Sequence, residues 1–186
     1  MLIKNGKIFT CEEGKIYEKG DILIKDGKIS RIGEDLSQYI GEEEVIDAKG
    51  LLIFPGFIEA HCHLGLHEEG NNGAGNGTNE ASEPITPQMR AIDGINPFDG
   101  GFQSAREAGV TTAVIGPGSA NVIGGQFAAV KTSGICIDDM IIKEPVAIKV
   151  AFGENPKTNY SGQNKVPSTR MSVGALLRDE LTRAQN

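Results

Sequence analysis

The chain is poor in the residue types that cross-link or anchor many small proteins. It has no tryptophan, three cysteines and three histidines among 186 residues. The cysteines lie far apart and form no CxxC pair, which argues against a disulfide framework or a structural zinc knuckle and favours a reducing cytoplasm. A cytoplasmic location is therefore expected. The three cysteines are Cys11, Cys62 and Cys136.

Clusters of positive charge and long apolar runs are also missing. Lysine and arginine are dispersed and the net charge is −7, so a nucleic-acid partner is not expected. The stretch LLIFPGFI is about half as long as a membrane span and is interrupted by Pro-Gly. The start, MLIKNGKIFT, has no apolar core of a signal peptide. The sequence therefore predicts a soluble protein without a membrane partner.

Residues 1–54 have the pattern of short strands joined by tight turns. Asn5-Gly6 and Asp26-Gly27 each lie between runs rich in isoleucine. Such dipeptides are the strongest short-range signal for a hairpin, because both central residues of a type I′ turn need positive φ. We expect these strands to form a portion of a small β-sandwich domain, since a sheet of this size needs further partners to be stable.

Residues 55–186 alternate between apolar runs of strand length and helices or long loops. The runs FIEAHCHL, VTTAVIG, FAAVKTSG and PVAIKVAFG predict strands, GGFQSAREAG predicts a helix that Gly109 ends, and STRMSVGALLRDELTRAQ predicts a capped helix. This alternation favours an α/β fold with a parallel sheet. A (β/α) barrel typically needs ~250 residues. We therefore expect residues 55–186 to form the first half of an incomplete TIM-like barrel.

All three histidines lie in one short stretch, PGFIEAHCHLGLH, at residues 55–67. Because side chains alternate along a strand, His61 and His63 share one face and Cys62 points the other way. Two imidazoles at this spacing, at the carboxyl end of a barrel strand, can bind one metal ion together. An HxH pair also occurs by chance, but this pair opens a long Gly/Asn loop. We predict metal binding by His61 and His63, and a place at the rim for His67.

The glycine-rich stretch GPGSANVIGGQ fits neither dinucleotide-binding nor P-loop spacing. We place it in a loop at the strand ends, where polar side chains can hydrogen-bond a substrate. These substrate-binding candidates are Ser119, Asn121 and Gln126. The alternative is that the same side chains bond to the backbone of their own loop.

The segment LLIFPGFIEAHCHLGLHEEG resembles the signature of the metal-dependent amidohydrolase superfamily, in which a β-strand domain leads through a PGFID-HxH segment into the barrel. Three further stretches, NEASEPITPQMRAIDGINP, AGVTTAVIGPGSANVIGGQ and AFGENPK with PSTRM, are similar to its imidazolonepropionase-related branch. The resemblance covers essentially the whole chain. It departs from the family at Glu59, where Asp is usual, and at Cys62, where Thr is common.

The resemblance implies a hydrolase of non-peptide carbon–nitrogen bonds, in cyclic amides or amidines, that uses water activated by a divalent metal. Zinc is expected, with iron as the alternative. His61 and His63 would be the first ligands. A bridging ligand would come from Lys149, as a carboxylated lysine, or from Glu154. The alternative is that both residues are structural, Lys149 as a lysine of the barrel wall and Glu154 as the cap of a turn.

The family also uses later histidines and a general-base aspartate, and neither is matched in this sequence. No histidine follows His67, and five aspartates lie outside the family motif: Asp93, Asp99, Asp138, Asp139 and Asp179. We therefore expect an N-terminal portion of the enzyme, with the catalytic base unassigned and the activity of these residues by themselves in question. Its expected partners are a small-molecule substrate and either a second copy or a complementing C-terminal segment. The alternative is a catalytically inactive metal-binding or assembly fragment.

Overall fold

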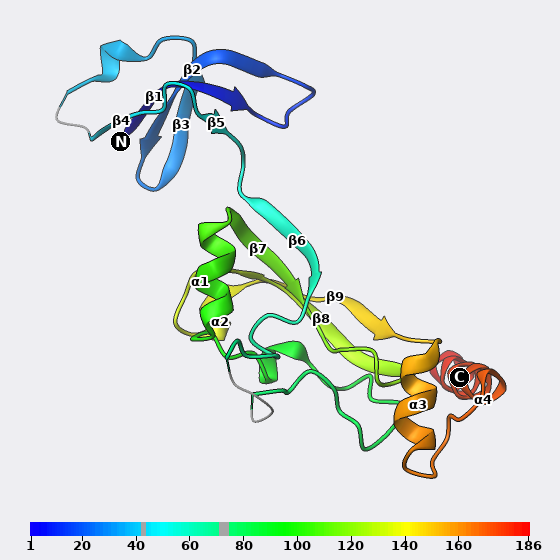
Figure 1. The fold of residues 1–186 in the computed structure, drawn as a ribbon. Helices are drawn as coiled ribbons and strands as arrows, with labels where there is room; N and C mark the ends of the chain where they lie inside the picture. The colour runs from blue at the N-terminus through cyan, green and yellow to red at the C-terminus, as the bar shows by residue number, and fades with distance from the viewer. Residues whose placement is uncertain (42–43, 71–74) are drawn as a thin grey trace. The chain divides into compact units, whose positions relative to one another are not determined.

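The computed structural model describes residues 1–41, 44–70 and 75–186 (Figure 1). The chain divides into two compact units, Met1–Gly56 and Phe57–Asn186, and each is described by itself. The identities predicted for residues 1–54 and 55–186, a β-sandwich portion and the first half of a hydrolase barrel, stay predictions. None of the helices in the described ranges is long and apolar enough to cross a membrane.

The first unit is built on one five-stranded sheet (Figure 1). Its strands follow the order β3-β2-β1-β4, and β5 also pairs with β1. The pairs β1–β2 and β2–β3 are antiparallel, whereas β4 and β5 run parallel to β1. The elements are β1 (Leu2–Phe9), β2 (Ile16–Lys25), β3 (Lys28–Gly33), the 3-10 helix η1 (Ser37–Tyr39), β4 (Val45–Asp47) and β5 (Leu52–Ile53).

One of the two predicted hairpin turns is confirmed and the other is wrong. Asp26 and Gly27 join β2 to β3 with φ angles of 51° and 69°. Asn5-Gly6 instead lies inside β1, where the pairing with β2 shifts register. The irregular strand accommodates Asn5 at a φ of 63°. The Asn5 backbone N–H donates to Asp21 Oδ1 at 3.0 Å, and its side-chain amide donates to Asp47 Oδ1 at 2.9 Å. The left-handed Asn5 therefore marks a bulge here rather than a chain reversal.

The second unit is a mixed α/β structure around a four-stranded sheet of order β6-β7-β8-β9 (Figure 1). The strands are β6 (Phe57–Cys62), β7 (Val110–Ile115), β8 (Ile123–Lys131) and β9 (Ile141–Val150). The helices are η2 (Ala91–Asp93), α1 (Gly100–Glu107), α2 (Ile137–Met140), α3 (Glu154–Ser161) and α4 (Arg170–Gln185).

The sheet is less parallel than the sequence pattern predicted. β6 and β7 are parallel, joined by a crossover that contains α1, but β7–β8 and β8–β9 are antiparallel. The connections at residues 116–122 and 132–140 are shorter than the dozen or so residues that a parallel crossover needs. The expectation of a parallel sheet is therefore wrong beyond β7, because a buried apolar strand does not reveal its direction.

The helix ends test the predictions made from capping residues in the sequence. Asp99 caps α1 by accepting a hydrogen bond from Gly101 N, and Gly109 follows the helix at a φ of 85°. Thr169 and Ser172 form a reciprocal capping box at the start of α4. Both predicted helices are confirmed. α3 was not predicted, because its sequence, ENPKTNYS, has no apolar periodicity.

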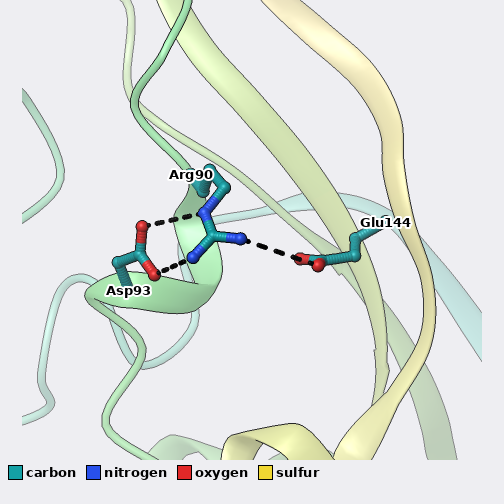
Figure 2. Close-up of polar contacts among 3 residues, drawn as sticks. All are labelled: Arg90, Asp93 and Glu144. Carbon is teal, nitrogen blue, oxygen red and sulfur yellow. Dashed lines mark hydrogen bonds and ion pairs between the residues drawn. The ribbon is translucent and has the colours of Figure 1, made fainter.

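The core of this unit lies between the sheet and the segments that cover it. Residues of η2, α1, β7, β8 and α2 form one buried apolar cluster, with Leu66 from the loop after β6. Figure 2 shows a polar link at the edge of this region: the Arg90 guanidinium donates to both carboxylate oxygens of Asp93, at 3.0 and 2.7 Å. It also lies 3.9 Å from Glu144 Oε1 on β9, so it ties η2 to that strand.

Candidate metal centre

The two candidate ligand histidines lie at the carboxyl end of β6, on the same side of the strand. The ring centroids of His61 and His63 are 5.6 Å apart with the rings nearly perpendicular. The chain turns directly afterwards, because the N–H groups of Leu66 and His67 both donate to the His63 carbonyl at 3.0 Å. Alternation along the strand thus brings the two imidazoles together, while the half-buried Cys62 has its Sγ 3.8 Å from the carbonyl of Val114.

The His63 ring is oriented by the strand next to it. Its Nδ1 lies 2.7 Å from the carbonyl oxygen of Gly116, directly after β7. A carbonyl oxygen accepts hydrogen bonds and never donates, so Nδ1 carries the hydrogen and the lone pair lies on Nε2. A glycine is required at 116, because a Cβ there would lie 2.2 Å from the Phe127 ring. This arrangement is the one that prepares a histidine to bind a metal through Nε2.

The His61 ring faces a lysine that is 88 positions away in the sequence. Lys149 Nζ lies 3.3 Å from His61 Nε2, and the Phe127 ring packs edge-on against His61 at 5.5 Å between centroids. Gly124 leaves room for this lysine, since a Cβ at 124 would lie 3.2 Å from Lys149 Cγ. β6 and β9 are the outer strands of the sheet, and the lysine side chain joins them at this end.

Electrostatics at the pair favour neutral nitrogens. Burial, followed by the nearby charge of Lys149, lowers the pKa of His61, and burial also lowers the pKa of Lys149. A neutral imidazole is the form that ligates a metal. A neutral lysine amine is the form that reacts with carbon dioxide to give a carbamate.

The structure separates the two candidates for a bridging ligand. Lys149 lies beside His61, whereas Glu154 begins α3, is exposed, and pairs with Lys157 Nζ at 2.7 Å. Glu59 Oε1 accepts a hydrogen bond from the backbone N–H of His61 at 2.9 Å. No group of three or more histidine, cysteine or acidic side chains could hold a metal ion within the described ranges. The side chains that meet at this end of the sheet are therefore two imidazoles and a lysine, and imidazole nitrogen is a ligand type of divalent ions such as zinc.

An open hollow of about 490 Å³ lies next to His63. It is lined by His63, Leu64, His67, Glu69, Asn76, Thr78, Asn79, Gly118 and Ser119. The hollow is large enough for a small ring compound. His67 is exposed at its wall, as predicted for a rim residue.

The three predicted substrate-binding side chains have different surroundings. Ser119 lines the hollow. Asn121 is 1% exposed, and its amide nitrogen lies 2.7 to 3.0 Å from the carbonyls of Glu80 and Glu83 and the Thr86 hydroxyl. Gln126 donates to the Pro87 carbonyl at 3.0 Å. Asn121 and Gln126 therefore bond to the segment at residues 80–87 rather than to the backbone of their own loop, and Gln126 lies in β8 rather than in a loop.

Two buried residues to which the sequence analysis gave no role hold loops of this unit in place. Asp99 is buried and accepts hydrogen bonds from Gly65 N, Glu69 N and Gly101 N at 3.0 to 3.1 Å, so the cap of α1 also fixes the loop after His63. Tyr160 is fully buried, donates to the Glu83 carbonyl at 2.6 Å, and has its pKa raised to about 12 by burial. Asp99 was recognisable as a helix cap, but its reach to Gly65 was not.

Comparisons with known proteins find relatives that are named as hydrolases. No protein-family model matches the chain. The amidohydrolase tasK of Hapsidospora irregularis is 32% identical in an alignment of 209 residues that covers 98% of this chain and 21% of that protein. The dihydroorotase of Caldicellulosiruptor saccharolyticus is 44% identical over 64 residues, covering 34% of this chain and 15% of that protein.

A solved structure extends the likeness to the whole chain. The amidohydrolase from Thermotoga maritima MSB8 superposes with a TM-score of 0.91 at 40% identity, covering 100% of this chain and 47% of that one. The chain is therefore similar over its whole length to a protein named amidohydrolase and has the fold of one part of it, which confirms the predicted fold class. It spans about half of the Thermotoga structure and about a fifth of tasK. These relatives leave the imidazolonepropionase-related branch a prediction.

Proposed function

We propose that this chain forms the histidine half of the metal centre of a hydrolase that cleaves non-peptide carbon–nitrogen bonds, in cyclic amides or amidines. One observation carries the proposal: His61 Nε2 faces Lys149 Nζ at 3.3 Å, beside a His63 ring whose Nδ1 is held by a carbonyl at 2.7 Å. The likeness to proteins named amidohydrolase and dihydroorotase supports the reaction class.

His61 and His63 would hold a divalent metal through Nε2, with zinc as the expected ion and iron as the alternative. When bound, the ion supplies a Lewis acid that activates water and polarises the substrate carbonyl. The Gly116 carbonyl keeps the His63 ring in the ligating tautomer. Phe127 packs against the His61 ring and limits its rotation.

Lys149 is the proposed bridging ligand, in preference to Glu154. Its neutral Nζ would attack the carbon of CO₂ and form an N–C bond, and the proton released from nitrogen would pass to water. The resulting carbamate would add a carboxylate beside His61, where the described histidine, cysteine and acidic side chains form no group of three or more that could hold a metal ion. The general-base aspartate stays unassigned, and we place the substrate ring in the hollow beside His63 and Ser119.

The test is the zinc content of the purified chain after dialysis against chelator-treated buffer. We expect near one zinc per chain, lost in His61→Ala/His63→Ala and kept in His67→Ala, which is the matched control because it removes the third histidine from the same hollow. Zinc that survives in the double variant, or that falls equally in the control, would contradict the proposal. Hydrolysis of a cyclic amide by the loaded chain separates an enzyme from the alternative, a metal-binding portion without turnover.

A macromolecular partner is the second part of the proposal. Apolar side chains are exposed on both outer strands, with Ile58 of β6 67% exposed and Ile148 of β9 54% exposed. Such surfaces favour self-association or a complementing segment. Light scattering tests this: we expect species larger than one chain, and a monomer at all concentrations would contradict it. The cytoplasm is the proposed location, supported by three free cysteines.

A further inference from the structure

A second, polar pocket of about 390 Å³ adjoins the hollow at His63. Its lining consists of Asn79, Ser119, Ala120, Asn155, Thr158 and Asn159. Asn79 and Ser119 also line the hollow, so the two spaces share a wall. A small ligand with its reacting bond near His63 would reach this pocket with its far end.

Helix α3 supplies one side of the polar pocket. Asn155, Thr158 and Asn159 are spaced i, i+3 and i+4, and therefore lie on one face of the helix. The same helix is anchored to the loop at residues 80–83 by Tyr160, whose hydroxyl donates to Glu83, and by Gln163 and Lys165, which follow it. These contacts fix the polar face of α3 opposite Ser119.

The lining offers hydrogen-bond donors toward the pocket. Asn155 Nδ2 donates to Ser119 Oγ at 2.6 Å, which leaves the Ser119 hydroxyl hydrogen for another acceptor. Asn79 accepts from Ala120 N through Oδ1 at 3.0 Å, which leaves its NH₂ group to donate. The side chain of Asn159 also lines the pocket and lies next to the Tyr160 hydroxyl.

The charge of the lining decides which acceptor fits. The six lining residues include no lysine, arginine or histidine that could compensate an anion. The polar side chains of the lining are amides and hydroxyls, so an anion placed there would lose its hydration without a compensating charge. A neutral carbonyl oxygen exchanges its bonds to water for bonds to amide and hydroxyl groups at little electrostatic cost.

We propose that the polar pocket is a specificity site for an uncharged carboxamide group of the substrate, held away from the C–N bond that is cleaved. This inference rests on the proposed function for the position of that bond. It assigns Ser119, Asn155 and Asn79 to substrate selection rather than to catalysis.

The experiment uses two probes with the same ring, hydantoin-5-acetamide and hydantoin-5-acetic acid, titrated into the zinc-treated chain by calorimetry. We expect the amide to bind at least about tenfold more tightly, which is the size of one good hydrogen bond. Ser119→Ala and Asn155→Ala should each reduce this preference to about threefold or less. Ser104→Ala, on the exposed face of α1, is the matched control and should keep the preference in full. Thr158→Val, at an exposed helix position, provides a second pocket variant if either of the others fails to fold.

Equal binding of the two probes, tighter binding of the acid, binding of neither, or a preference that survives all pocket variants would overturn the inference. Zinc content measured on the same samples separates this result from the proposed function. If zinc is bound by His61 and His63 but the amide is not preferred, the inference about the polar pocket is overturned and the proposed metal centre stands. If the amide is preferred but no zinc is bound by the histidines, the pocket inference stands and the proposed metal centre is overturned.

Discussion

The polar side chains of the second unit fall into two groups with opposite surroundings. Around Asn121 and Tyr160 they are almost fully buried, and their amide and hydroxyl groups donate to carbonyls of the loop at residues 80–86. At the end of β6, His61 and Lys149 are in contact with each other, nitrogen to nitrogen, and are partly open to solvent. Burial with full hydrogen bonding indicates a structural role, whereas gathered lone pairs at a surface indicate a site that binds a ligand.

The largest expected effect on stability comes from Asn121→Ala. It removes a buried amide whose two N–H groups serve two carbonyls and one hydroxyl, so we expect a loss of about 3 kcal/mol in the free energy of unfolding. Urea denaturation measures this loss. Asn155→Ala, an exposed asparagine of α3, is the control and should change stability by less than about 0.5 kcal/mol. Equal losses in the two variants would contradict the structural role assigned to the buried, hydrogen-bonded group.

Lys149→Met tests the second group, the side chains at the end of β6, which we expect to bind a ligand. We expect zinc affinity to fall by about 10- to 100-fold, as is typical when a group that supports a metal site is removed. Stability should hold, because burial already disfavours the charged lysine and methionine has a similar length. Calorimetric zinc titration and thermal denaturation of the same samples provide both numbers. Unchanged zinc affinity would show that Lys149 is not a ligand of the metal centre. Glu154→Gln is the matched variant that tests Glu154, the other candidate ligand.

Tyr160→Phe tests the structural role of the buried group through the pH dependence of stability. The pKa of Tyr160 is raised to about 12, so the folded chain keeps this proton at pH values where the unfolded chain has lost it. The resulting stabilisation is complete below the ordinary tyrosine pKa of about 10 and is lost as pH rises through about 12. We expect the variant to lose about 1 kcal/mol at pH 8, measured by urea denaturation. Its stability should also fall less steeply than that of the parent from pH 10 upward, and parallel pH profiles would contradict this.

The smallest effect is expected for Glu144→Gln. The carboxylate lies 3.9 Å from the guanidinium of Arg90, and both side chains are a third to a half exposed. Such surface pairs contribute about 0.5 kcal/mol or less. Differential scanning calorimetry at low and high salt measures it. A loss above about 1 kcal/mol would mean that the link between η2 and β9 belongs with the buried structural group.

The sequence was informative where the determinant is local. Alternation along one strand placed His61 and His63 on the same side, and Asp26-Gly27 formed the turn that two positive φ angles require. Asn5-Gly6 has the same chemistry but lies in a bulge, because its bonds to Asp21 and Asp47 depend on strands distant in sequence. The direction of β8 and β9 followed from loop length rather than from the apolar pattern.

The contact between His61 and Lys149 shows why the rest of the site was harder to predict. It needs β9 to return to the end of β6, a small residue at 124, and Phe127 beside the imidazole. None of these features is visible in the residues around Lys149 itself. Glu154 has an equally suitable side chain in the same stretch of sequence, and its pairing with Lys157 appears once α3 is formed.

The most direct test of the metal centre is zinc-edge X-ray absorption on the loaded chain and its single histidine variants. We predict two imidazole ligands per zinc in the parent and in His67→Ala, and one in His61→Ala and in His63→Ala. An imidazole count that does not change in His63→Ala, or a zinc without imidazole ligands in the parent, would contradict the account.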